Sequence, residues 1–331
     1  MKKIIIISVI LIGTLVSLIA CTGSEERDKP LVMTSLFPQY DFTRAVAGDL
    51  VDVEYLLPPG TSAHSFEPSA RTVASILDAD ALIYTGESME PWVHTLIESN
   101  APDSLSILDL TQNVRLIDSD GHIYESEVHD DHDDHDKEDH DEDEHDHGAY
   151  DPHIWTDPLN AIQMVEDITA LLVELVPEEA QTLNANKDAY VAELNRMHLA
   201  FLDLVENSER QTIMHGGHNA MGYFVARYNL EYVNPYRGFS TDAEPTPQAI
   251  ASMVDTMNTY NIEHLFSEQL ISPNVSNAIS EETGATILYL YAGGNIPLDE
   301  FNDGLTFLDM LEHNLEQLKI GLGYTGDDMS G

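Results

Sequence analysis

The feature that most constrains the fold is one apolar stripe that runs through a long, otherwise polar segment, residues 178–207. Its apolar residues recur at steps of 7, 4, 3, 4 and 3, which is the spacing of one face of an α-helix. They are Leu183, Tyr190, Leu194, Met197, Phe201 and Leu204. A helix of about 30 residues is roughly 45 Å long, which exceeds the diameter of a small domain. The segment therefore predicts a rigid helix that joins two lobes.

Short apolar runs and amphipathic stretches alternate on both sides of this helix. Before it, we expect strands at 31–36, 51–57, 81–85 and 105–108 and helices at 39–46, 72–77, 90–99 and 159–175. After it, we expect strands at 211–214, 231–233, 264–266 and 286–291 and helices at 220–228, 247–260, 273–282 and 298–321. This alternation is typical of parallel sheets covered by helices. The predicted fold is α/β, with two lobes that each contain a mostly parallel sheet flanked by helices, joined by one long rigid helix.

The start of the chain resembles the signal peptide of a bacterial lipoprotein. Lys2 and Lys3 precede an apolar stretch, and the tetrapeptide LIAC that ends at Cys21 resembles a lipobox, whose cysteine is acylated. We expect a signal peptide over 1–20, lipidation of Cys21 and a flexible tether over 21–30. The mature protein would then be anchored outside the cytoplasm, on the outer face of the membrane or on its periplasmic side. A plain membrane anchor of about 17 residues is the less favoured alternative.

The rest of the chain divides at the long helix. The expected units are an N-terminal lobe, a linker helix, a C-terminal lobe and a tail, at residues 31–176, 177–208, 209–323 and 324–331.

Composition excludes several classes of protein. The chain has 14 Lys and Arg against 59 Asp and Glu, a formal net charge of −45, whereas nucleic-acid binders present a basic face. A single cysteine argues against a disulfide-rich protein or a zinc ribbon. The hydrolase patterns HExxH and GxSxG do not occur in the sequence.

An acidic, histidine-rich segment, residues 122–147, interrupts the N-terminal lobe. It holds seven of the fifteen histidines and fourteen acidic residues. With so few apolar residues it cannot offset its ordering entropy, so we expect a disordered loop. The favoured role is a weak chelator that gathers Zn²⁺; a sensor of zinc abundance and a solvated spacer are the alternatives. The expected accessory ligands are His129, His132, His135, His140, His145 and His147.

Deleting residues 122–147 therefore tests the chelator role. We expect the deletion to lower the number of zinc ions bound in a titration by removing the low-affinity sites and to leave the tightest site in place, because binding in a disordered loop must offset the entropy of ordering it. If the number of bound zinc ions is unchanged, a solvated spacer is the remaining role for this segment.

Three of the other histidines stand in loops after strands or at helix entries. His64 lies in PPGTSAHSFEP, His153 in YDPHIWTDP and His218 in MHGGHNAMGYF. Three imidazoles that meet in the crevice between two lobes would suit Zn²⁺, and imidazole-rich ligation favours zinc over manganese. We expect ordinary hydrogen-bonded roles for His94, His198, His264 and His313. His215 is expected to be a backbone-bonded residue at a strand end, with an accessory ligand as the alternative.

Several long stretches resemble the metal-specific solute-binding proteins of ABC importers, the ZnuA/TroA-like family. They are PPGTSAHSFEPSARTVASILDADALIYTGESMEPWV, DPHIWTDPLNA, GHNAMGYFVARYNLE and the run from EPTPQAIASMV to EETGATIL, and the resemblance covers about 31–323. It implies two lobes bridged by a long helix and the metal ligands His64, His153 and His218. It also implies a non-enzyme, a monomer that binds no nucleic acid and serves an ABC permease with its ATPase subunit. The histidine-rich loop is similar to one in the zinc-specific branch.

The sequence departs from this family at the fourth ligand. Many relatives place an acidic residue in the loop after the last strand, but here the loop reads LYLYAGGNI. Water, Glu268 or Tyr291 are the candidates for this position. The absence of a carboxylate weakens the case for manganese.

The function expected from the sequence is capture of Zn²⁺ outside the cytoplasm and its delivery to an ABC-type metal importer. The alternatives are a receptor of the same family for manganese or another divalent metal, a zinc-dependent hydrolase or hydratase, and a surface adhesin.

Overall fold

The computed structural model describes residues 27–98, 101–118, 122–125, 150–236, 238–239 and 244–326. The predicted signal peptide, Cys21 and the six expected accessory histidines of the acidic loop lie outside these residues. None of the described helices has the length and apolar character that a membrane span requires.

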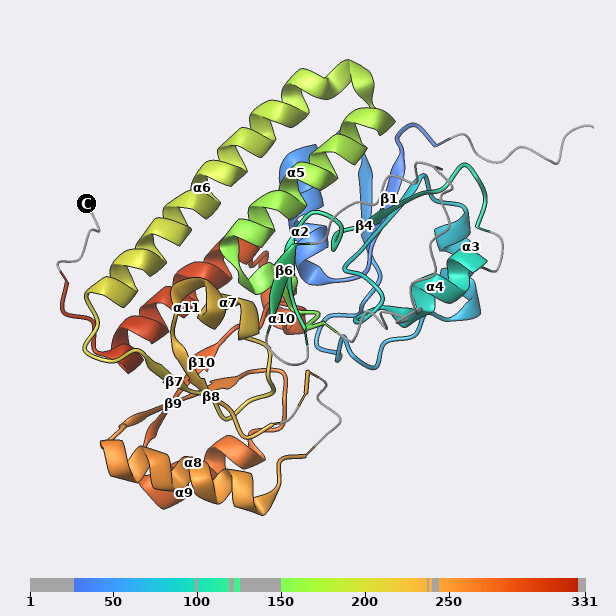
Figure 1. Ribbon diagram of the computed structural model, residues 1–331. Helices are drawn as coiled ribbons and strands as arrows, with labels where there is room; N and C mark the ends of the chain where they lie inside the picture. The colour runs from blue at the N-terminus through green and yellow to red at the C-terminus, as the bar shows by residue number, and fades with distance from the viewer. Residues whose placement is uncertain are drawn as a thin grey trace, which may run out of the picture.

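The N-terminal half is built on a four-stranded parallel sheet. Its order is β2-β1-β3-β4, with β1 at Leu31–Thr34, β2 at Asp52–Tyr55, β3 at Ala81–Tyr84 and β4 at Ser106–Asp109. One face packs against α2 (Phe37–Ala47) and α5 (Pro158–Leu175), and the other against α3 (Ala70–Leu77) and α4 (Pro91–Glu98) (Figure 1). Side chains alternate between these layers because successive strand residues point to opposite faces.

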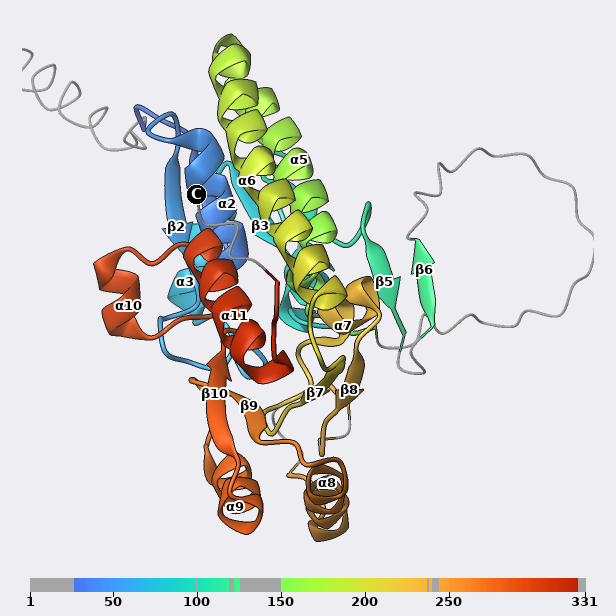
Figure 2. The same cartoon turned by 90° about the vertical axis from the view of Figure 1, so that its left-hand side faces the viewer.

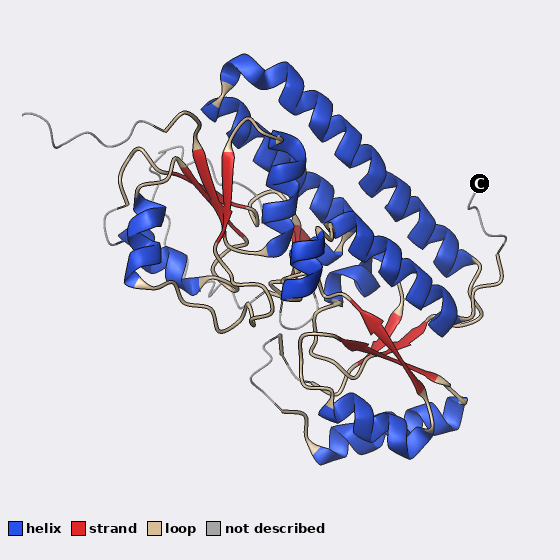
Figure 3. Cartoon of the chain, turned by 180° about the vertical axis from the view of Figure 1, so that it is seen from behind, coloured by secondary structure: helices blue, strands red, loops and turns tan. Residues whose placement is uncertain are grey.

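The C-terminal half repeats this arrangement. Strands β7 (Thr212–Met214) and β8 (Glu231–Val233) pair in parallel, as do β9 (His264–Glu268) and β10 (Thr286–Leu290). A parallel bridge from His215 to Phe266 joins the two pairs, which gives the order β8-β7-β9-β10. Helices α8 (Pro247–Tyr260) and α9 (Asn274–Thr283) cover the outer face, while α7 (Gly222–Tyr228) and α11 (Phe307–Leu322) lie on the inner side (Figure 3).

One long helix runs along both halves, as the apolar stripe predicts. A 3₁₀ turn, η2 (Pro177–Glu179), leads into α6 (Ala180–Glu206), which packs on α2 and α5 of one half and on α7 and α11 of the other (Figures 1 and 2). Five residues of the stripe are fully buried: Leu183, Leu194, Met197, Phe201 and Leu204. Each such side chain contributes about 1.5–3 kcal/mol, so together they rival the about 5–15 kcal/mol of net stability of a typical domain. Separating either half from α6 would expose these side chains to water.

The expected helix at 298–321 is instead two helices, so that prediction is wrong. Helix α10 (Leu298–Asp303) ends at Gly304, which has a φ of 82° that glycine adopts without strain. Thr306 then begins α11: its hydroxyl accepts from the amide of Asp309, and the Asp309 carboxylate accepts from the Thr306 amide.

The start of the expected disordered loop also differs from the prediction. Residues of β6 (Ile123–Glu125) pair antiparallel with β5 (Arg115–Ile117). Ile123 and Tyr124 favour extended backbone, which explains why this short stretch forms a strand although the composition of 122–147 as a whole argues against order.

A buried carboxylic acid joins the loops that follow β1 and β3. The Glu90 side chain lies in hydrogen-bond contact with the Ser35 hydroxyl, and the amide of Thr85 donates to its Oε2 at 3.1 Å. Burial raises the pKa of Glu90 to about 8, against the lowering effect of these hydrogen bonds. The neutral acid can donate to the Ser35 hydroxyl, which in turn donates to Gln39 Oε1 at 2.8 Å.

This acid should make the stability of the metal-free protein depend on pH. Because the folded pKa lies above the unfolded value of 4.5, the folded state holds the extra proton between about pH 4.5 and 8. The free energy of unfolding then falls as pH rises through this window, by about 1.4 kcal/mol per pH unit. We expect Glu90→Gln, which stays neutral, to remove this component of the slope in urea unfolding between about pH 6 and 8. The exposed neighbour Glu87 provides the control, since Glu87→Gln should keep the wild-type slope; an unchanged slope in Glu90→Gln would contradict the prediction.

Candidate metal centre

The three histidines singled out in the sequence lie where the two halves meet. His64 belongs to the loop between β2 and α3, residues 56–69, here called the His64 loop. His218 follows β7, and His153 stands directly before a 3₁₀ turn, η1 (Ile154–Thr156), that leads into α5. The carboxyl ends of parallel strands in both halves therefore face one cleft, which is where ligands bind in open α/β folds. The cleft has a volume of about 270 Å³.

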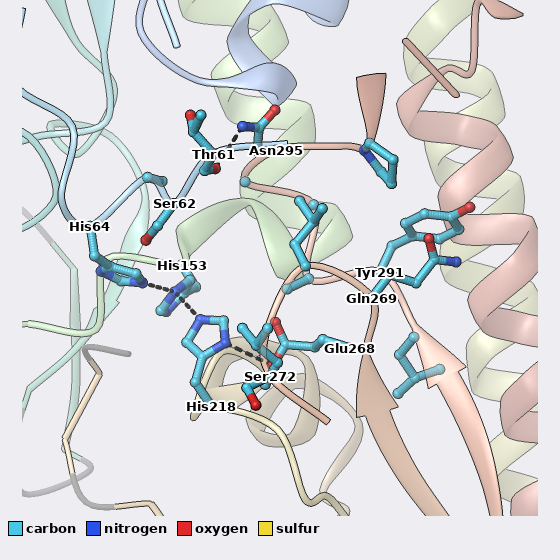
Figure 4. A pocket seen from close by; sticks show the side chains of 18 of the residues that line it. Thr61, Ser62, His64, His153, His218, Glu268, Gln269, Ser272, Tyr291 and Asn295 are labelled. Carbon is cyan, nitrogen blue, oxygen red and sulfur yellow. Dashed lines mark hydrogen bonds and ion pairs between the residues drawn. The ribbon is translucent and has the colours of Figure 1, made fainter. Parts of the chain in front are cut away.

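The structure brings these three rings together. His153 Nε2 lies 3.3 Å from His64 Nε2 and 3.2 Å from His218 Nε2 (Figure 4), and the ligand atoms of all three lie within 4.8 Å of one another. Nitrogen atoms bound tetrahedrally to zinc at about 2.0–2.1 Å are about 3.3–3.4 Å apart. Both distances from His153 Nε2 are therefore those between two ligands of one tetrahedral ion.

A buried aspartate orients His153. The Asp151 carboxylate accepts from the Nδ1 of His153 at 2.7 Å and from its amide at 3.0 Å, and neither side chain is more than 2% exposed. The Asp151 backbone is held from two sides, by Ile117 of β5 and by the hydroxyl of Tyr223 in α7. Gly222 makes room for this carboxylate, because a Cβ there would collide with Asp151 Oδ2.

A buried glutamate at the end of β9 orients His218 in the same way. Glu268 Oε1 accepts from His218 Nδ1 at 2.7 Å. Although burial has the opposite effect on each group, this pairing lowers the pKa of Glu268 and raises the pKa of His218. A Cβ at Gly217 would lie 2.5 Å from Glu268 Oε1, so the glycine allows the approach.

These carboxylates decide which ring nitrogens face the cleft centre. An ionised carboxylate only accepts, so in the neutral rings the Nδ1 atoms of His153 and His218 carry the proton and their Nε2 atoms carry lone pairs. Two lone pairs pointing at each other across 3.2 Å cannot form a hydrogen bond. They attract a cation, and a carboxylate behind the ring strengthens the imidazole as a metal ligand.

His64 is the third ring and has a different environment. Burial, followed by the two neighbouring histidines, lowers its pKa to about 3. The ring is therefore neutral near pH 7 and can offer a lone pair. Within the described part of the chain, its ring contacts are with His153 and His218 rather than with a carboxylate.

Neither protein candidate for a fourth ligand points at the three rings. The Tyr291 hydroxyl donates to Glu300 at 3.0 Å, and Glu268 Oε1 is engaged by His218. In Figure 4, Glu268 lies on the side of His218 that faces away from His153, and Tyr291 lies farther away. The loop after β10, residues 291–297 and here called the β10 loop, packs Gly293 and Gly294 against the Trp155 ring, where a Cβ on either would come within 3.1 Å.

The remaining histidines that the structure describes lie outside the three-ring group. His198 pairs with the Tyr228 hydroxyl and His313 with the Tyr289 carbonyl, as expected for ordinary hydrogen-bonded residues. His215 is fully buried with its Nδ1 beside the Tyr232 hydroxyl at 3.1 Å. The backbone of Gly217 also hydrogen-bonds this ring, so the backbone bond expected from the sequence is present beside a side-chain partner.

Sequence reasoning missed Asp151 altogether and considered Glu268 only as a ligand. The sequence did contain a signal for Asp151, because it stands two residues before the candidate ligand His153. At this spacing a carboxylate can reach both the ring and the amide of the histidine. Glu268 is 50 residues from its partner His218, so only the fold brings the two together.

Known proteins match this chain over most of its length. Residues 32–321 match the family described as zinc-uptake complex component A, periplasmic. The chain is 30% identical over 303 residues to the zinc-binding lipoprotein AdcA of Streptococcus pneumoniae, covering 91% of this chain and 58% of that protein. It is 29% identical over 301 residues to the high-affinity zinc uptake system protein ZnuA of Bacillus subtilis, covering 91% and 90% of the two chains.

The fold comparison gives the same result. The crystal structure of the Zn(II)-bound ZnuA-like domain of Streptococcus pneumoniae AdcA superposes with a TM-score of 0.71 at 28% identity, covering 89% of this chain and 99% of that one. The fold is therefore that of two α/β lobes that share one long helix, with the three-histidine cleft where they meet. The chain belongs to the zinc-uptake complex component A family.

The carboxylates behind His153 and His218 should control zinc affinity. We expect Glu268→Gln and Asp151→Asn each to weaken zinc binding about 10–100-fold, because the amides lack the charge that strengthens the imidazole. Competition with a chromophoric chelator measures the change. Glu244, an exposed acidic residue that also lines the cleft, is the matched control. An equal loss in Glu244→Gln would mean that net charge matters rather than the paired carboxylates.

Proposed function

We propose that this protein captures Zn²⁺ outside the cytoplasm and delivers it to an ABC-type importer. The observation that carries the proposal is the convergence of the ring nitrogens of His64, His153 and His218 within 4.8 Å of one another, with His153 Nε2 3.3 Å and 3.2 Å from the other two Nε2 atoms. Membership of the zinc-uptake family and the likeness to zinc-bound AdcA support zinc as the transported ion.

Zinc rather than manganese fits the donor set. Three neutral imidazoles suit zinc, whereas manganese prefers carboxylate oxygen, and the β10 loop offers none. We assign the fourth position to water, because Glu268 and Tyr291 are bound to other partners. The role is binding and release; no hydrolysis, hydration or adhesion is part of the proposal.

The partners and location follow from the same family. We propose that Cys21 carries the lipid that anchors a monomer to the membrane, and that the acceptor is an ABC permease driven by its ATPase subunit. The chain spans 58% of the length of pneumococcal AdcA, so this proposal concerns the part of that protein that it matches. The histidine-rich loop would act as a low-affinity store of zinc.

Removing any one of the three rings tests the proposal. We expect His64→Ala, His153→Ala and His218→Ala each to weaken zinc binding by more than about 100-fold, because losing a ligand costs more than losing its supporting carboxylate. Isothermal titration with zinc and with manganese, together with elemental analysis, measures affinity and preference. In cells that depend on this importer, zinc uptake should be restored by the wild type and not by His153→Ala.

His264 provides the matched control, since it lies at the far end of β9 from Glu268. His264→Ala should bind zinc like the wild type. Tighter binding of manganese than of zinc, or an equal loss in His264→Ala, would contradict the proposed function.

A further inference from the structure

The β10 loop and the His64 loop, which come from opposite halves of the protein, are joined by the side chain of Asn295. Its Nδ2 donates to the carbonyls of Pro58 at 2.9 Å and Thr61 at 2.8 Å (Figure 4). The amide of Gly60 also donates to the carbonyl of Ile296 at 2.8 Å. Three hydrogen bonds thus cross from one loop to the other within a few residues of His64.

Asn295 is itself held in a single orientation. Its Oδ1 accepts from the Tyr55 hydroxyl and from the Ile296 amide, both at 2.8 Å, and the residue is 8% exposed. Two donors and two lone pairs are all that an asparagine side chain has, so every hydrogen-bonding position is used. Such a fully satisfied, buried amide is rigid and costly to disrupt.

The other end of the β10 loop is fixed next to His153. The Trp155 indole donates to the Ala292 carbonyl at 2.7 Å, and Trp155 lies two residues after His153. The β10 loop is therefore hydrogen-bonded at Ala292 to Trp155, just after His153, and through Asn295 to the segment before His64.

His64 needs such support more than the other two rings. Asp151 and Glu268 orient His153 and His218 directly, whereas the described contacts of the His64 ring include no carboxylate. Thr61 and Ser62, which precede it, are exposed, and the hydrogen bonds within the His64 loop are local, such as Thr61 to Pro58. The position of His64 thus depends on what holds its loop from outside.

We propose that Asn295 is a positioning residue that sets the place of His64 in the metal centre, so that the β10 loop controls metal retention without supplying a ligand. This inference rests on the proposed function, and it assigns a role to a loop that carries no acidic side chain at 291–297. Release of the metal would then begin with separation of the β10 loop from the His64 loop.

Zinc release into excess chelator, followed by stopped flow, tests the proposal in the full chain. We expect Asn295→Ala to raise the dissociation rate about tenfold or more, because the two donors that hold the His64 loop are lost. In a His64→Ala background the same substitution should change the rate less than about twofold, since the ring that Asn295 positions is already gone. If Asn295 had only a general structural role, Asn295→Ala would raise the dissociation rate by the same factor in both backgrounds.

Control variants test whether the effect on the release rate is specific to Asn295. Asn186, which donates from α6 to the Val46 carbonyl of α2, is an asparagine with a long-range bond away from the cleft, and Asn186→Ala should leave the rate unchanged. Asn295→Asp keeps the acceptor for Tyr55 and loses both donors, so it should reproduce the effect if Asn295→Ala folds poorly. Faster hydrogen exchange at amides 60–66 of the metal-free variants is the second expected result.

Two outcomes would overturn the proposal: an unchanged release rate in the Asn295 variants, or an equal increase with and without His64. Either result leaves the proposed function standing if wild-type protein binds zinc and His153→Ala does not. Failure of the wild type to bind zinc would instead overturn the proposed function itself.

Discussion

The apolar core that both halves share along α6 is the constraint on which the rest of the structure depends. Buried residues of both sheets, including Ile83 in β3 and Phe266 in β9, belong to one continuous cluster with Phe201 of α6. Arg227 of α7 adds an ion pair between the halves, because its guanidinium donates to Asp157 at the start of α5 at 2.6 Å. Because separating the halves would expose this core, their relative placement is nearly fixed, and movement in the cleft falls to loops and side chains.

Fixed halves allow a metal centre to be assembled from segments that are far apart in the chain. His64 lies 89 residues before His153, and His218 lies 65 residues after it. The buried carboxylates of Asp151 and Glu268 place two negative charges behind two neutral rings, so a divalent cation in the cleft balances the local charge. An acidic ligand in the β10 loop is not needed for neutrality, which agrees with the Ala-Gly-Gly sequence there.

Much of this could be predicted from the sequence, and the failures are local. The stripe of α6 and the alternation of strands and helices follow from the spacing of apolar residues along the sequence, which can be read within each short segment. The break at Gly304 was missed because the apolar pattern continues across it and only the positive φ ends the helix. The β5–β6 hairpin was missed because the pairing of Ile123 with Ile117 outweighs the acidic composition that follows.

The sequence by itself determined the type of fold and the three histidines, since hydrophobic period and ligand chemistry are properties of short stretches. Only the tertiary structure decided that Glu268 supports His218, that Tyr291 turns to Glu300, and that Asn295 holds the segment before His64. The physical reason is that a hydrogen bond depends on distance and direction between atoms, and for these pairs, which are 9, 50 and 234 positions apart, both are set by how the sheets, helices and loops pack.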